Sequence, residues 1–195
     1  MDFTAESTAA SFSKLLPAKM KGLGTVFLLA LSGRIYQPVD AEPQRLHFGQ
    51  CSLMVNLQEI RDYFSEIKHI IQAEDTIIDT RLLTESILHG IEAQESCCFL
   101  RHMLRFYVET VFKHHTPSNS LMERTTSRLA NSFLSIKRDL RQCSAELNCP
   151  CGEESKVRIE QIHNAFENLD FNAAAIKAIG EVNFLIHWMA QSHRN

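Results

Sequence analysis

The sequence predicts an all-α fold, a six-helix bundle in a single domain held by three disulfides. A chain of 195 residues with 45% apolar content can build one hydrophobic core and is too short for two comfortable domains. Several of its seven glycines and five prolines fall in the first fifty residues, so the remainder has few helix breakers. Beyond residue 56, apolar residues recur at helical spacing, and neither a strand pattern of period two nor an internal repeat is evident.

The amino-terminal segment is expected to direct secretion. Residues 22–31 form an apolar run of about ten residues after a lysine, which is signal-peptide length and well short of the roughly 20 residues that span a bilayer. Val39 and Ala41 form the small-residue pattern that signal peptidase reads, so cleavage is expected after Ala41, with Ser32 as second choice. This divides the chain into residues 1–41, which are removed, and residues 42–195, one helical domain.

The polar start of the chain leaves two points open. Residues 1–19 are unusually long for the polar part of a signal peptide, so Met20 is an alternative start. The alternative to secretion is a non-targeting extension that contains a short buried apolar turn.

The first two helices are separated by an acidic loop. An amphipathic helix of about four turns is expected from residue 56, with these core positions: Leu57, Ile60, Phe64, Ile67 and Ile71. Residues 74–80 break the period and are expected to form a loop. A shorter helical stretch around 82–88 follows, and Gly90 ends it.

The later helices carry broader apolar faces. Residues 99–113 are expected to form the central helix, which Pro117 prevents from continuing. The next helix ends at Cys143, and Ser155 is expected to cap the one after it. The final helix covers 171–191, where Trp188 is expected in the core. The core positions of these last three helices are Leu129, Phe133, Ile136, Leu140, Ile159, Ile162, Phe166, Leu169, Ile176, Ile179, Val182, Ile186 and Met189.

All six cysteines follow the expected signal and indicate a disulfide framework. Adjacent residues are too close for a relaxed disulfide, and a bond between Cys149 and Cys151 closes too tight a loop, so about ten of the 15 possible pairings remain. If Cys97 and Cys98 pair with Cys149 and Cys151, then Cys51 and Cys143 are left for each other. The order within the two close pairs stays open.

Several functional classes are disfavoured. The net charge of −3 gives no electrostatic sign of nucleic-acid binding, and no membrane insertion is expected. Zinc is disfavoured because neither the CC nor the CPC pair has the usual ligand spacing, and no motif of a catalytic nucleophile, phosphate loop or metalloprotease is present. We therefore expect no enzyme, metal or cofactor. His114 and His115 fit a solvated helix end, and the basic residues at 137, 138 and 141 fit a helix carboxyl terminus.

Five segments resemble a known family in order and spacing. They are NLQEIRDYFSEIKHIIQAED, CCFLRHMLRFYVETVFK, RLANSFLSIKRDLRQC, CPCGEE and AAAIKAIGEVNFLIHWM, and together they cover nearly all of residues 51–190. They are similar to the interleukin-10 family of helical cytokines, and within it to the interleukin-20 subfamily. The resemblance implies a secreted six-helix bundle with disulfides Cys51–Cys143, Cys97–Cys149 and Cys98–Cys151.

The resemblance also implies a function. Members of the family bridge a heterodimeric class II cytokine receptor, here of the interleukin-20-receptor type, and trigger JAK-STAT signalling. One receptor chain would contact the first helix, the loop 73–81 and the last helix, and the other would contact the first helix and residues 99–113. The loop residues expected to contact the receptor are Gln72, Glu74, Asp75, Ile77, Asp79 and Arg81. Glu74 departs from the family, which usually carries a lysine there.

Two expectations complete the prediction. The protein is expected to be a monomer, because two disulfide-bonded cysteines pin the segment 143–155 that a domain swap would need as a hinge. The alternative function is a secreted, disulfide-linked helical carrier or structural protein that uses the bundle interior. Binding of a soluble receptor ectodomain distinguishes the two functions.

Overall fold

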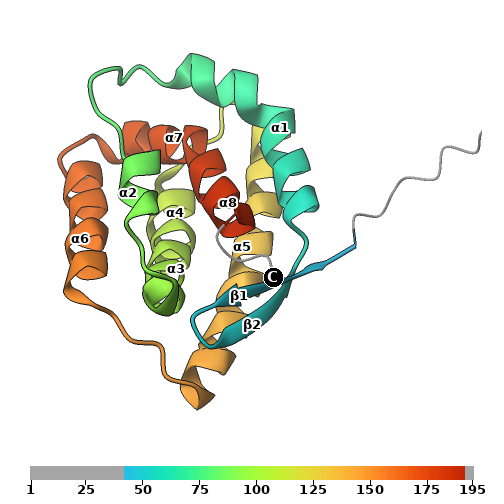
Figure 1. Ribbon diagram of the computed structural model, residues 1–195. Coiled ribbons are helices and arrows are strands. Elements are labelled where there is room, and N and C mark those ends of the chain that lie inside the picture. The colour runs from blue at the N-terminus through green and yellow to red at the C-terminus, as the bar shows by residue number, and fades with distance from the viewer. Residues whose placement is uncertain (1–41, 192–195) are drawn as a thin grey trace, which may run out of the picture. The chain divides into compact units, whose positions relative to one another are not determined.

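The structure is a computed structural model that describes residues 42–191. The apolar segment 22–31 and both expected cleavage sites lie outside these residues. Within the described range, a two-stranded hairpin precedes six helical stretches, the last of which is interrupted at Glu181 (Figure 1). The elements are β1 (Gln44–Phe48), β2 (Cys51–Val55), α1 (Leu57–Glu74), α2 (Glu85–His89), η1 (Ala93–Glu95), α3 (Ser96–Phe106) with its continuations η2 (Tyr107–Val111) and α4 (Phe112–His114), α5 (Ser120–Glu146), α6 (Glu153–Glu167), α7 (Phe171–Gly180) and α8 (Val182–Gln191).

Helix α1 forms as its spacing predicts. The Asn56 side chain caps it by accepting a hydrogen bond from the Glu59 backbone N–H at 3.1 Å. Its buried residues are the five that were predicted: Leu57, Ile60, Phe64, Ile67 and Ile71. This face packs against α5, α7 and α8, which places α1 along one side of the bundle (Figure 1).

The central helix is α3 together with η2 and α4, as expected from residues 99–113. It packs against α5, α6 and α7. The π-helical turn η2 contains Tyr107, which is fully buried and donates a hydrogen bond from its hydroxyl to the Ala178 carbonyl of α7 at 2.8 Å. Burial raises the pKa of the Tyr107 hydroxyl well above its ordinary value. The all-α core is therefore confirmed.

The hairpin was not predicted from the sequence. Strands β1 and β2 are antiparallel and five residues each, and Gly49 joins them with a φ of 58°. In β2, buried Leu53 and Val55 alternate with exposed Ser52 and Met54, which is a period-two pattern over a single short run. So short a run gives little signal beside long amphipathic helices, and β2 is held in place by packing on α5.

Several expected helix boundaries were wrong. Ser155 does not cap α6, because the helix begins at Glu153 and the Ser155 hydroxyl donates instead to the Glu95 carboxylate. The short helix α2 begins at Glu85 rather than near residue 82, and Thr84 caps it. The final helix is interrupted between α7 and α8 at Glu181. The Glu181 side chain accepts hydrogen bonds from the backbone N–H groups of Leu82 and Leu83.

Other expectations have mixed outcomes. His114 is exposed, but His115 is only 8% exposed, so the expectation of a solvated pair was half wrong.

Lys137 of α5 forms an ion pair at 2.6 Å with Glu109 of η2. Hydrogen bonds from Lys137 and Arg105 lower the pKa of Glu109 to about 2. Trp188 is 5% exposed and lies in the core as predicted, whereas Leu169 and Ile176 are only partly buried.

A search of the described helices finds none with the length and apolar content needed to cross a bilayer.

Candidate functional site

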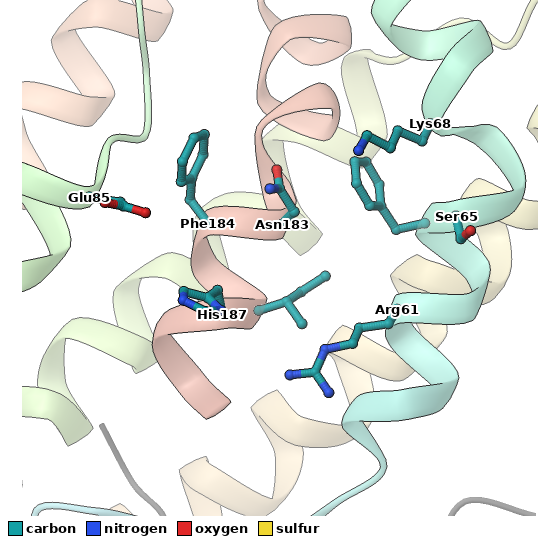
Figure 2. A pocket seen from close by; sticks show the side chains of 9 residues that line it. Arg61, Ser65, Lys68, Glu85, Asn183, Phe184 and His187 are labelled. Carbon is teal, nitrogen blue, oxygen red and sulfur yellow. The ribbon is translucent and has the colours of Figure 1, made fainter. Parts of the chain in front are cut away.

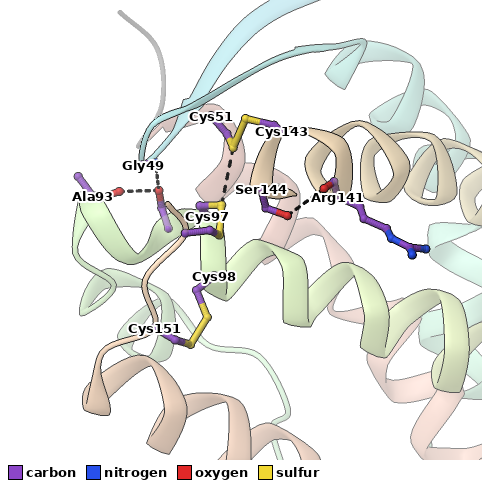
Figure 3. Close-up of a disulfide and its surroundings, with 11 residues drawn as sticks. Gly49, Cys51, Ala93, Cys97, Cys98, Arg141, Cys143, Ser144 and Cys151 are labelled. Carbon is purple, nitrogen blue, oxygen red and sulfur yellow. Dashed lines mark hydrogen bonds between the residues drawn. A yellow bond between two sulfur atoms is a disulfide. The ribbon is translucent and has the colours of Figure 1, made fainter. Parts of the chain in front are cut away.

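Three disulfides join strand β2 to α5 and the segment between α5 and α6 to α3. Cys51–Cys143 joins β2 to α5, with 5.8 Å between Cα atoms. Cys97–Cys149 and Cys98–Cys151 join α3 to the segment 147–152, at 5.6 and 5.3 Å. These are the pairs that the family resemblance implies. Figure 3 shows that the first bridge lies beside Cys97, whose sulfur is 3.9 Å from that of Cys51. The bundle is therefore braced covalently at this end.

A buried lysine holds the first part of the loop after α1. The Lys177 ammonium on α7 donates to an Asp75 carboxylate oxygen at 3.0 Å and to the Ile77 carbonyl at 2.6 Å. Its side chain is 5% exposed and that of Asp75 is 17% exposed. The other Asp75 oxygen accepts from the Ile77 backbone N–H at 3.1 Å. The start of the loop is thus fixed to α7 by a desolvated ion pair.

A buried glutamate holds the second part of the same loop. One Glu181 carboxylate oxygen accepts hydrogen bonds from the backbone N–H groups of Leu82 and Leu83, at 2.9 and 2.8 Å. The other oxygen is 3.6 Å from the Lys177 ammonium. Both leucine side chains are buried. We refer to Lys177 and Glu181 with these contacts as the clasp.

The clasp separates the loop's expected receptor contacts into two groups. Asp75 faces the clasp, and Ile77 and Glu74 are partly buried. Ile78 projects outward and is 92% exposed. The remaining expected contacts are exposed: Gln72, Asp79 and Arg81. Ile78 was not among the expected contacts, although it is the isoleucine that points into solvent, whereas Ile77 and Asp75 also support the loop.

A groove runs between α1 and α8 and continues to this loop. Figure 2 shows side chains from α1 and α8 facing each other across it, with Glu85 at its edge. This part has a volume of about 460 Å³ and is lined by Arg61, Phe64, Ser65, Lys68, Glu85, Asn183, Phe184, Ile186 and His187. A second part of about 420 Å³ shares Lys68 and Phe184 and reaches Ile78 and Arg81. We call the two parts the α1–α8 groove.

The α1–α8 groove has an unbalanced charge. Arg61, Lys68 and Arg81 form no ion pair within residues 42–191. Of the acids that line the groove, Asp75 and Glu181 are engaged by Lys177, so that only Glu85, at the edge, stands unpaired within the described residues against these three cations. The groove therefore offers cationic side chains around an exposed isoleucine, a combination that suits an acidic protein surface with an apolar centre.

A second groove lies on the other side of α1, against α5. It has a volume of about 510 Å³, and exposed Met54 of β2 stands at its rim. Arg128 of α5 lies over the Tyr63 ring of α1, with its guanidinium carbon 5.6 Å from the ring centroid. The Tyr63 hydroxyl donates to the Glu59 carboxylate, and this hydrogen bond is the main cause of a raised pKa of Tyr63. We call this surface the α1–α5 groove.

The second receptor-facing element expected from sequence was residues 99–113. In the structure, many of these residues are buried where α3 and η2 pack against α5, α6 and α7. The helix that shares an open groove with α1 on this side is α5. The family resemblance assigns this contact to residues 99–113, and no pattern in the sequence marks α5 as the helix that borders a groove with α1. Arg128 and Tyr63 carry no motif that marks them as a pair.

The comparisons with known proteins agree with this architecture. The family profile described as Interleukin 10 matches residues 23–192. The chain is 43% identical to interleukin-20 of Mus musculus, over 88% of this chain and 99% of the relative. It is 36% identical to interleukin-19 of Homo sapiens, over 74% and 82% of the two chains.

Two solved structures are similar in fold. The crystal structure of human interleukin-19 has a TM-score of 0.64 at 36% identity, covering 70% of this chain and 88% of that one. A PROSS-edited human interleukin-24 has a TM-score of 0.65 at 34% identity, covering 77% and 99%. A disulfide-linked α bundle with open surface grooves is the architecture of a helical cytokine. The chain belongs to the interleukin-10 family, so the predictions of family, fold and lack of enzymatic activity are confirmed.

Proposed function

We propose that the chain is a secreted cytokine that bridges a heterodimeric class II receptor of the interleukin-20-receptor type and triggers JAK-STAT signalling. The observation that carries the proposal is the position of the two grooves on α1. Arg61, Ser65 and Lys68 line the α1–α8 groove, and Glu59 and Tyr63 line the α1–α5 groove. At about 100° per residue these two sets lie roughly 180° apart around the helix, on either side of its buried face.

This arrangement supports two simultaneous contacts. Each groove lies between α1 and a different helix, so one receptor chain in each groove leaves the other groove free. A disulfide-braced bundle loses little conformational entropy when it binds, because its surface is already ordered. The clasp also reduces the conformational entropy lost on binding, because it fixes the loop that carries Ile78 and Arg81. Two chains held on one rigid body bring their intracellular segments together.

Secretion and a monomeric state belong to the same proposal. Three disulfides persist in an oxidising compartment, which supports export followed by removal of residues 1–41. The cysteines at 149 and 151 bond the segment 147–152 to α3, which supports a closed monomer of residues 42–195 rather than a swapped dimer. Intact mass after secretion and light scattering test these two points.

The alternative of a helical carrier is less well supported. A carrier would bind its ligand among apolar side chains inside the bundle, whereas both grooves described here are on the surface and bear charged residues. Soluble receptor ectodomains immobilised one at a time distinguish the two. A cytokine is expected to bind at least one ectodomain directly, and absence of binding to every class II ectodomain tested contradicts the proposal.

Charge at the loop allows a finer test of the receptor contact proposed there. Glu74 stands where the family usually has a lysine, and it is only partly buried. Glu74→Lys replaces a negative charge with a positive one at the end of α1, so association with an acidic receptor chain at the loop is expected to become faster and more sensitive to salt. Binding kinetics at two salt concentrations measure this. Identical association rates for parent and variant would place the contact away from the loop.

A further inference from the structure

A cluster of potential metal ligands lies at the disulfide-braced end, away from both grooves. The ligand atoms of Cys98, His102 and Cys151 all lie within 4.8 Å of one another. In the structure the two sulfurs are joined in a disulfide, and a disulfide sulfur is a poor ligand because zinc binds the thiolate. Reduction of this disulfide would therefore supply the two thiolate ligands that a metal site needs.

The spacing on α3 distinguishes this disulfide from its neighbour. Cys98 and His102 are four residues apart in one helix, so their side chains lie on the same face one turn apart. Cysteine and histidine at such spacing can reach one zinc ion. The corresponding position for Cys97 is Arg101, which offers no ligand atom at neutral pH. Only the Cys98–Cys151 bridge therefore has a histidine one turn further along α3.

We propose that reduction of the Cys98–Cys151 disulfide converts the cluster into a zinc site with two thiolate ligands, one imidazole and a water molecule. A dithiol reductant supplies two electrons and two protons: the Cys98–Cys151 bond breaks, and the reductant closes its own disulfide. Zinc then binds the two sulfurs and displaces both thiol protons to solvent, so the two thiolates balance the charge of the ion.

The reduced cluster is held together without the bond that is broken. Cys97–Cys149 remains and keeps the segment 147–152 against the start of α3. A tetrahedral zinc site with Zn–S bonds of about 2.3 Å needs the two sulfurs about 3.8 Å apart. The Cα atoms of Cys98 and Cys151 are 5.3 Å apart, so rotation of the two side chains is enough to reach that separation.

The cluster is open to solvent on one side. Cys98 is buried, whereas the His102 side chain is partly exposed. Cys151 is partly exposed, which gives the reductant access.

The test is a dithiothreitol titration of the oxidised full chain without oxygen, with and without zinc. Free thiols are alkylated at each step, and peptide masses report which cysteines have reacted. Zinc at a concentration well above its dissociation constant is expected to lower the dithiothreitol concentration for half-reduction of Cys98–Cys151 about tenfold. The bridges at Cys97 and Cys51 are expected not to shift.

Variants and a spectroscopic probe make the assignment specific. His102→Ala is expected to abolish the zinc effect, whereas His89→Ala, at an exposed histidine on α2, keeps it. Cobalt(II) added to the partly reduced chain is expected to show thiolate charge-transfer absorption that His102→Ala alters and Cys98→Ser/Cys151→Ser removes. An unchanged titration with zinc, or the same shift in His102→Ala, overturns the proposal. Melting of each oxidised variant verifies that it is folded.

Discussion

Two connecting segments of this bundle are fixed by different chemistry. The segment 147–152 is attached to α3 by two covalent bonds, and the segment 75–84 is attached to α7 by the buried clasp of Lys177 and Glu181. The covalent attachment restricts the unfolded chain as well as the folded one. The clasp exists only in the folded state and needs every partner, because removing one leaves buried charge behind. Loss of a single residue therefore has different consequences in the two places.

The largest effect is expected from the longest disulfide. Cys51–Cys143 joins residues 92 positions apart, which is worth roughly 4.7 kcal/mol of stability by loop entropy. Cys97–Cys149 and Cys98–Cys151 close nearly the same loop, so removing either one alone leaves the other in place. Urea unfolding of the three paired Cys→Ala variants tests the ranking. Equal losses in all three would show that loop length does not govern their contribution.

A single substitution in the clasp is expected to approach that effect. Lys177→Met removes the cation and leaves Asp75 and Glu181 with desolvated carboxylates, at an expected cost of about 3–5 kcal/mol in unfolding free energy. Lys156→Met is the matched control, because the ion pair of Lys156 with Glu153 is exposed. Urea unfolding measures both. A loss below about 1 kcal/mol in Lys177→Met would mean that water solvates the two acids.

Two neighbouring loop residues are expected to separate stability from binding. Asp75→Ala removes the partner of Lys177 and of the Ile77 backbone N–H, so a loss of about 1–3 kcal/mol in stability is expected. Ile78→Ala is expected to leave melting unchanged and to weaken receptor binding by about 1–2 kcal/mol. Thermal melts and ectodomain binding of both variants decide this.

The smallest effect concerns pH at the end of α4. His115 is 8% exposed, and burial lowers the pKa of its imidazole, although Glu74 opposes the shift. The unfolded chain takes up this proton near pH 6.5, before the folded chain does, so stability falls as pH drops below about 6.5. His115→Gln is expected to flatten the dependence between pH 7.5 and 5, and His89→Gln is the exposed control. Parallel curves for parent and His115→Gln would contradict this.

The sequence predicted the elements whose signals are local and repeated. All five buried positions of α1 were predictable because the 3–4 spacing persists over the whole helix. The hairpin was missed because each strand is short and depends on packing against the bundle. The prediction that Ser155 caps a helix was wrong because its hydrogen-bond partner, Glu95, is 60 residues away in sequence.

In the candidate site, too, contacts between residues far apart in the sequence could not be predicted. The loop after α1 was found through the family resemblance, but its division into supporting and exposed residues depends on Lys177, which is 102 residues from Asp75. No spacing rule joins positions so far apart. The α1–α5 groove was also beyond sequence reasoning, because Tyr63 and Arg128 meet only when the two helices pack.

The central claim is that α1 presents two independent receptor surfaces. The most direct measurement is the mass, by analytical ultracentrifugation, of the complex formed with the two soluble ectodomains of one receptor. One copy of each chain is expected in the parent complex. Arg61→Glu is expected to lose one ectodomain and Tyr63→Ala the other. Tyr63→Ala is expected to melt at a lower temperature because Tyr63 also packs against the core, so binding of both variants is measured well below their melting temperatures. Loss of the same ectodomain in both variants, or an intact three-chain complex in both, would contradict the claim.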